Sequence, residues 1–153
     1  MEKGIQRTAE RDALIAGVST FVVDAVIQFF TLRSKAPIPI SVDSITNNVH
    51  TVLGASVGLG IFLAMLMTII NYSKIKGRKV PFFPKVFLLM IKHGFFTFGV
   101  LTALSVMWQR YVGTIEIGLL PAVFIIALIA GIVSATINYL TIRGCLLPER
   151  SSG

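Results

Sequence analysis

The sequence predicts an all-α integral membrane protein with four transmembrane helices, arranged as two tandem helical hairpins. Three observations lead to this prediction. The chain is 54% hydrophobic and only 14% charged, whereas soluble domains usually carry about 25% charged residues. It contains four apolar runs near or above the roughly 20 residues that a helix needs to cross a bilayer. A sequence motif also recurs at the ends of the second and fourth runs, as expected of an internal repeat.

The apolar runs cover residues 13–32, 51–72, 86–108 and 117–142. None alternates apolar and polar residues, as the strands of a membrane barrel would. The runs are therefore predicted to be helices, because a helix satisfies every backbone polar group within one segment. Proline-containing polar segments at 33–50 and 73–85 and a tight turn at Gly113 and Thr114 separate the runs. No linker divides the chain, so we expect a single membrane domain, residues 1–153.

Basic residues are distributed unequally between the two ends of the predicted helices. If the N-terminus is cytoplasmic, ten Lys and Arg residues lie on that side and three on the other. The ten are Lys3, Arg7, Arg11, Lys74, Lys76, Arg78, Lys79, Lys85, Arg143 and Arg150, and the three are Arg33, Lys35 and Arg110. Because cytoplasmic loops carry the excess of Lys and Arg, we predict cytoplasmic N- and C-termini in a plasma or inner membrane.

The second and fourth runs end in the same motif, Ile-Asn-Tyr-x-x-Ile-(Lys/Arg)-Gly. It begins at Ile70 and again at Ile137, 67 residues later, and the first run matches the third at an offset of 77. Chance similarity between apolar helices is the alternative, but Asn and Gly are not generic helix residues. We predict that residues 11–77 and 84–144 are duplicated hairpins, related by a pseudo-two-fold axis along the membrane normal.

Asp24 is a carboxylate within the first apolar run. Thr20 and Gln28 lie one turn to either side on the same helix face, which Gly17 and Thr31 extend. Ionisable residues inside a membrane are costly, face the protein interior and mark ion or proton pathways. We expect this face to point inward or toward a partner. A hydrogen-bonded carboxyl that joins helices is the alternative interpretation.

The third run adds Lys92, His93 and Thr97 to the candidates for an ion or substrate pathway. Lys92 lies only about 10 Å along the helix from Lys85, so its amine can reach the headgroups. Its depth differs from that of Asp24 by about 13 Å, which disfavours a direct ion pair. His93 suits either a change of charge near neutral pH or a hydrogen bond between packed helices.

A second group of residues is assigned to helix packing. Its small members are spaced by four residues, which allows close approach of helices, and its two asparagines recur in the repeat and suit hydrogen bonds between helices. The group consists of Gly54, Gly58, Ala127, Gly131, Ala135, Asn71 and Asn138.

Several classes of function find no support in the sequence. The net charge of +7 lies at the ends of apolar runs and forms no aromatic-interleaved stripe, so we expect no nucleic-acid binding. No HExxH, glycine-rich phosphate loop, GxSxG or pair of carboxylates is present, and Cys145 is the only cysteine. We therefore expect a protein without catalytic activity, metal or cofactor.

Two functions remain after these exclusions. The first is transport: four helices make a small bundle, so a carrier or channel would be a homo-oligomer in the lipid bilayer, with the Asp24 and His93 faces along the route. The alternative is a non-catalytic accessory or assembly subunit of a larger membrane complex, whose polar faces and basic loop bind partner membrane subunits. The intramembrane acidic residue favours transport.

Overall fold

The computed structural model describes residues 2–35, 37–41, 51–75 and 79–145. In chain order the elements are α1 (Glu2–Leu32), β1 (Ile38–Ile40), α2 (Val52–Lys74), a single irregular helical turn η2 (Phe82–Val86), α3 (Phe87–Tyr111), β2 (Ile115–Ile117) and α4 (Leu119–Cys145). Each of the four long helices is long and apolar enough to cross a membrane. The chain is therefore a helical membrane protein.

The predicted runs match these helices except near their ends. α1 begins at Glu2, well before the apolar run, because the polar residues that precede the run include good helix formers such as Glu, Arg and Ala. The fourth helix begins at Leu119 rather than at Ile117, since Ile117 belongs to β2. Gly113 has a positive φ of 81° in the connection between α3 and β2, a conformation that glycine adopts without strain.

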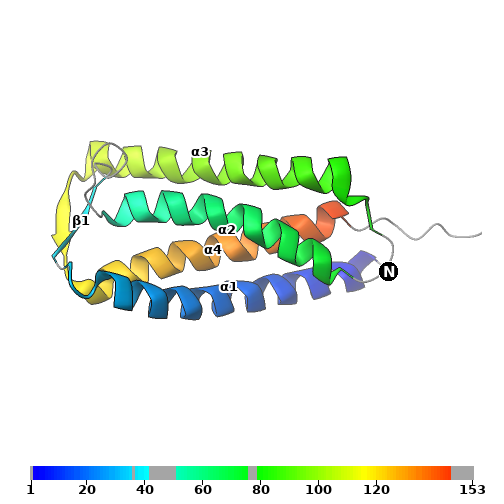
Figure 1. Cartoon of the computed structure of the whole chain (residues 1–153), viewed down its shortest axis with the longest axis horizontal. Helices are drawn as coiled ribbons and strands as arrows, with labels where there is room; N and C mark the ends of the chain where they lie inside the picture. The colour runs from blue at the N-terminus through cyan, green and yellow to red at the C-terminus, as the bar shows by residue number, and fades with distance from the viewer. Residues whose placement is uncertain (1, 36, 42–50, 76–78, 146–153) are drawn as a thin grey trace, which may run out of the picture.

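The four helices lie side by side in the order α1, α4, α2, α3 (Figure 1). α1 packs along α4, α4 also packs against α2, and α2 packs against α3. The helices of each predicted hairpin, α1 with α2 and α3 with α4, are not the main packing pairs in the described part of the chain. The structure therefore does not confirm hairpins as packing units.

A short antiparallel ribbon joins the two connections at one end of the bundle. β1 pairs with β2 in the register Ile38 with Ile117, Pro39 with Glu116 and Ile40 with Ile115. Ile38 and Ile40 are buried in a hydrophobic cluster that includes Leu32 and Val52 from the adjacent helix ends. We call this the ribbon end, and the opposite end, where α1 begins and α4 finishes, the terminal end (Figure 1).

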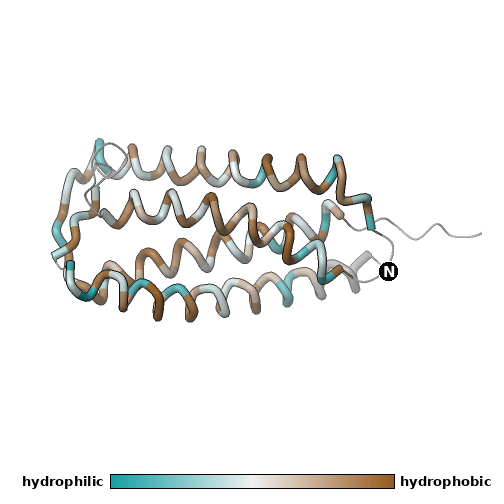
Figure 2. Tube along the Cα trace, viewed as in Figure 1, coloured by the Kyte–Doolittle hydropathy of each residue, from teal (hydrophilic) through white to brown (hydrophobic). Residues whose placement is uncertain are grey.

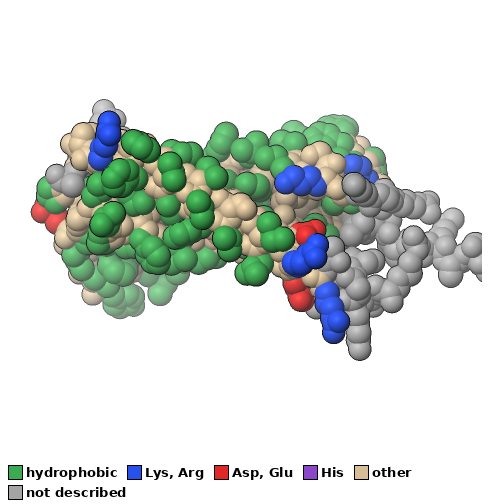
Figure 3. All heavy atoms as spheres, turned by 90° about the horizontal axis from the view of Figure 1, so that it is seen from below, with side chains coloured by type: hydrophobic (Ala, Val, Ile, Leu, Met, Phe, Trp, Pro, Cys, Tyr) green, Lys and Arg blue, Asp and Glu red, His purple; other side chains and the backbone are tan. Residues whose placement is uncertain are grey.

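The surface of the bundle is apolar along its middle and charged at its two ends (Figure 3). Large hydrophobic side chains point outward along the helices, as at Phe95, which is 73% exposed. Hydrophilic residues gather at both ends of the bundle and are fewer along the middle of the helices (Figure 2). This distribution suits a surface in contact with lipid chains, because lipid does not penalise exposed apolar side chains.

Candidate functional site

The interface between α1 and α4 is formed by small residues in close backbone contact. A Cβ added at Gly17 would lie 3.0 Å from both the carbonyl oxygen of Gly131 and the Cβ of Ala135. A Cβ added at Gly131 would lie 3.0 Å from the carbonyl oxygen of Gly17. Only residues of this size allow the two helices to approach so closely. Tight packing therefore fixes the face of α1 that carries the polar candidates.

Thr20 lies on this face and bonds across the interface. Its hydroxyl donates a 2.9 Å hydrogen bond to Ser134 Oγ of α4, and Ser134 donates in turn to the Ala16 carbonyl at 3.4 Å. Ser134 is fully buried and Thr20 is half-buried. The two hydroxyls thus form a short polar link between α1 and α4 near the middle of both helices.

Asp24 lies one turn closer to the ribbon end on the same face of α1, with a side chain only 5% exposed. Its Oδ1 accepts a long, 3.4 Å hydrogen bond from Gln28 Nε2, while its Oδ2 is buried with no hydrogen-bond partner among the described residues. A buried polar atom without a partner is costly, especially in a bilayer. Thr31 departs from the predicted face: it is exposed, and its hydroxyl donates to the carbonyl of Ile27.

The two repeated asparagines meet between α2 and α4. Asn138 Nδ2 donates to Asn71 Oδ1 at 3.0 Å, and both side chains are buried. Their remaining polar atoms, Asn71 Nδ2 and Asn138 Oδ1, have no partner in the described part of the chain, nor does Oγ1 of the fully buried Thr141. This cluster therefore holds one donor and at least one acceptor that are available to a small polar ligand.

His93 forms the link between α3 and α2. Its Nδ1 lies 2.9 Å from Thr68 Oγ1, and the Thr68 hydroxyl donates to the Ala64 carbonyl at 2.7 Å. Because a hydroxyl has a single hydrogen to donate, Nδ1 of His93 must carry the hydrogen that it shares with Thr68. The other ring nitrogen, Nε2, then remains able to accept a proton. Both side chains are buried.

These links form one connected series of polar side chains, which we call the polar row. In order it consists of Gln28, Asp24, Thr20, Ser134, Asn138, Asn71, Thr68 and His93. Members on different helices are joined by hydrogen bonds, and members on one helix lie one turn apart on a shared face, about 5–6 Å between Cβ atoms. Every member is buried or half-buried. The row therefore passes through all four helices.

The polar row covers most of the thickness of the apolar bundle. From Gln28 to Thr20 it descends about 12 Å along α1, and from Ser134 to Asn138 about 6 Å along α4. Gln28 lies four residues from the ribbon end of α1, and Asn71 three residues from the terminal end of α2. The members nearest the two ends of the bundle, Gln28 and Asn71, are thus each about one helical turn from the end of their helix, and from Asn71 the row turns back through Thr68 to His93.

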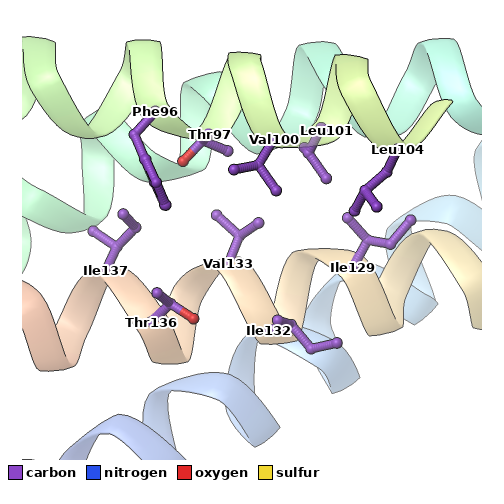
Figure 4. Close-up of a pocket in the computed structure, with 10 residues that line it drawn as sticks. All are labelled: Phe96, Thr97, Val100, Leu101, Leu104, Ile129, Ile132, Val133, Thr136 and Ile137. Atoms are coloured by element: carbon purple, nitrogen blue, oxygen red, sulfur yellow. The ribbon is translucent and has the colours of Figure 1, made fainter. Parts of the chain in front are cut away.

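Of the other predicted pathway residues, Lys92 lies outside the polar row, and Thr97 lies one turn beyond its last member, His93, on the same face of α3. Lys92 is exposed, and its helix does not pack against α1, so the structure brings it near neither Asp24 nor Thr20. Thr97 is buried and lines a cavity of about 190 Å³ between α3 and α4. Of the ten residues that line this cavity, Thr97 and Thr136 are the polar ones (Figure 4). Its apolar lining offers few groups to bind an ion.

The predicted packing residues fall into two groups. Gly131 and Ala135 contact α1, and Ala127 is fully buried on the same helix. On α2, Gly58 is exposed, with no atom within 4 Å of an added Cβ, and Gly54 is half-buried. The first group lies inside the bundle, whereas Gly58 lies on its outer surface.

Three residues of this region were not among the predicted candidates, namely Ser134, Thr68 and Thr141. A local signal exists for each, since Ser134 precedes Asn138 by one turn, Thr68 precedes Asn71 by three residues and Thr141 follows Asn138 by three. Hydroxyl side chains are common in membrane helices, where they bond to the preceding turn. Their role emerges only when the neighbouring helices are placed.

The described residues contain no group of three or more His, Cys, Asp and Glu side chains that would hold a metal ion. Comparisons with family models, with curated proteins and with solved structures find no match to this chain.

Proposed function

We propose that this chain is a non-catalytic membrane transport protein that conducts a small cation along the polar row. The observation that carries the proposal is the row itself, which extends through the apolar bundle to within about one turn of both helix ends. A series of buried polar groups across a bilayer is costly, and such groups usually mark ion or proton routes.

Asp24 supplies the negative charge in this route. It is the only carboxylate in residues 13–32 and in α2, α3 and α4, and its Oδ2 has no partner among the described residues. A passing cation would complete the hydrogen-bonding or coordination of this oxygen, and the carboxylate would offset part of the cost of removing the cation from water. The negative charge and the oxygen without a hydrogen-bond partner together support a binding step at Asp24.

We propose that the terminal end faces the cytoplasm of a cell with a plasma or inner membrane. The described basic residues support this orientation. Seven lie toward the terminal end, namely Lys3, Arg7, Arg11, Lys74, Lys79, Lys85 and Arg143, and three lie toward the ribbon end, namely Arg33, Lys35 and Arg110. Cytoplasmic segments carry the excess of Lys and Arg. A reporter that is active only in the cytoplasm should therefore be active when it is fused after Gly153.

We also infer that the chain arose by duplication of a helical hairpin, with a pseudo-two-fold axis along the bundle. Two contacts support such an axis, because residues on it pair with their own counterparts. Asn71 and Asn138 differ by 67, the offset of the second and fourth helices. Pro39 and Glu116 pair at the centre of the ribbon and differ by 77, the offset of the first and third. An experimental structure in which the halves do not superpose would refute the duplication.

The polar row lies within a single chain, so the proposed route does not need residues from another copy. Assembly into a homo-oligomer stays a prediction, which native mass spectrometry of the detergent-extracted protein would test. The same measurement addresses the accessory role, since an assembly subunit would be extracted with a different membrane protein in fixed stoichiometry.

Ion flux into vesicles tests the transport function directly. The purified protein is reconstituted into phosphatidylcholine and phosphatidylglycerol vesicles, and charge movement is followed with a voltage-sensitive dye, once under a salt gradient and once under a pH gradient. We expect Asp24→Asn to reduce the flux about 100-fold, the factor that corresponds to the roughly 2.5–3.5 kcal/mol cost of an intramembrane charge. Asp12→Asn is the matched control, because Asp12 lies on the same helix and its side chain is 44% exposed. Equal flux in both variants under each of the two gradients would refute the proposal.

A further inference from the structure

We propose that the conducted species is the proton rather than an alkali or divalent cation. The inference rests on the proposed transport function and identifies its substrate. It follows from the space around Asp24, from the chemistry of the groups next to it and from the unpaired polar atoms farther along the polar row.

Close helix packing restricts the space between α1 and α4 on the terminal side of Asp24. Two turns away, Gly17 and Gly131 approach so closely that a single methyl group at either position would lie 3.0 Å from the opposite backbone. The Cβ of Phe21, three residues from Asp24, would lie 3.2 Å from a methyl group added at Gly131. A metal or alkali cation must either keep water or exchange it for a shell of protein oxygens. The tight seam between α1 and α4 disfavours a hydrated ion.

The groups beside Asp24 also provide too few oxygens for a dehydrated metal ion. Ca²⁺ takes about six to eight oxygen ligands, and Mg²⁺ requires an octahedral shell. Gln28 presents its amide nitrogen, a donor, to Oδ1 of Asp24, and Thr20 adds a single hydroxyl oxygen, which leaves this set well short of six oxygens. A proton needs only one lone pair, and Oδ2 of Asp24 has that lone pair available.

The remaining members of the polar row suit proton transfer through hydroxyls and bound water. Near the terminal end, Asn71 Nδ2, Asn138 Oδ1 and Thr141 Oγ1 are buried without partners among the described residues. One water molecule that accepts from Asn71 and donates to Asn138 would satisfy this set, since buried waters typically make about three hydrogen bonds. His93 adds an acceptor at Nε2, because its Nδ1 hydrogen is held by Thr68.

The proton balance of the central step is simple. A proton from water on one side binds the lone pair of Asp24 Oδ2 and converts the carboxylate into a neutral carboxylic acid. The O–H bond then breaks, and the proton leaves to a water molecule on the other side, which regenerates the carboxylate. No electron is transferred, and no co-reactant besides water is required.

Proton flux in vesicles tests this inference separately from transport in general. Vesicles of phosphatidylcholine and phosphatidylglycerol, loaded with a pH-sensitive dye and with potassium, receive valinomycin to set an inside-negative potential. We expect wild-type protein to acidify the interior at least about tenfold faster than protein-free vesicles, and replacement of external sodium by choline to leave this rate unchanged. Asp24→Glu, which keeps a carboxyl group, should retain measurable proton flux, and Asp24→Asn should lose it.

The outcomes separate the two proposals. Wild-type flux of sodium or potassium without acidification would overturn the proton inference and leave the transport function standing. Wild-type vesicles that pass neither protons nor metal cations would overturn both. The ion-replacement measurements use the unmodified protein, so they decide the question even if a substitution at Asp24 prevents folding.

Discussion

Asp24, Asn71 and Asn138 each have a buried polar atom without a partner in the described part of the chain. Such atoms cost free energy in proportion to the hydrogen bond that they lack. In a bilayer the cost increases, because the surrounding hydrocarbon offers no hydrogen-bond partner. A protein whose only task is to hold four helices together would be more stable with apolar residues at these positions. Their presence is therefore more readily explained by function than by stability.

The asparagine pair gives a prediction at the residue scale. Asn138→Leu removes the 3.0 Å hydrogen bond to Asn71 and leaves a buried amide without a partner. We expect the free energy of unfolding in detergent micelles to fall by about 1 kcal/mol, in the range measured for hydrogen bonds between membrane helices. Combining it with Asn71→Leu should cost less than the sum of the two single changes. Strict additivity in this double-mutant cycle would show that the two amides do not interact.

The individual polar residues of the candidate site can be predicted from the sequence, but the hydrogen bonds between them cannot. Asp24, His93 and the asparagines stand out because polar residues are rare in apolar runs. The links between them depend on which helices are neighbours. Lys92 was a candidate on the same grounds and is exposed in the structure, since a long side chain near a helix end can reach the headgroups.

At the scale of elements, the lengths of the four helices follow from the apolar runs, but their spatial order does not. A water-soluble helix shows its packing face as a hydrophobic stripe. In these helices the outward side is apolar as well, as Phe95 and Phe62 illustrate, so the stripe is lost. The strands β1 and β2 have three residues each, which is too short for an alternating pattern to predict.

The close contact between α1 and α4 gives a prediction at this scale. Gly131→Ala places a methyl group 3.0 Å from the Gly17 carbonyl oxygen, a backbone atom that cannot move aside easily. We expect a loss of about 1–3 kcal/mol in the free energy of unfolding. Gly99→Ala is the matched control, because its added methyl group meets no atom within 4 Å. It should leave stability unchanged or raise it by up to about 1 kcal/mol through helix propensity.

Thermal unfolding of both variants in the same detergent measures the difference. A Gly131→Ala protein as stable as the Gly99→Ala protein would indicate that α1 and α4 are not in backbone contact. Close packing of α1 and α4 would then no longer disfavour a hydrated metal ion over a proton.

In the whole molecule, the helices lie in the order α1, α4, α2, α3, so α2 and α4, whose ends carry the repeated motif, are at the centre of the bundle (Figure 1). The ionisable members of the polar row are not repeated: Asp24 corresponds to Leu101 and His93 to Ala16 at the offset of 77. A duplicated scaffold thus carries an asymmetric polar route. This asymmetry follows from residue identities alone, whereas the continuity of the route depends on how the helices pack.

Continuity of the polar row is the central claim, and a pair of threonines on α1 tests it most directly. Thr20 lies in the row and bonds to Ser134 of α4, whereas Thr31 is exposed and bonds only within its own helix. Replacing each by valine removes one hydroxyl group and keeps the shape. We expect Thr20→Val to reduce ion flux in reconstituted vesicles at least about tenfold and Thr31→Val to leave it unchanged. Equal flux in the two variants and the unmodified protein would contradict a route through the polar row.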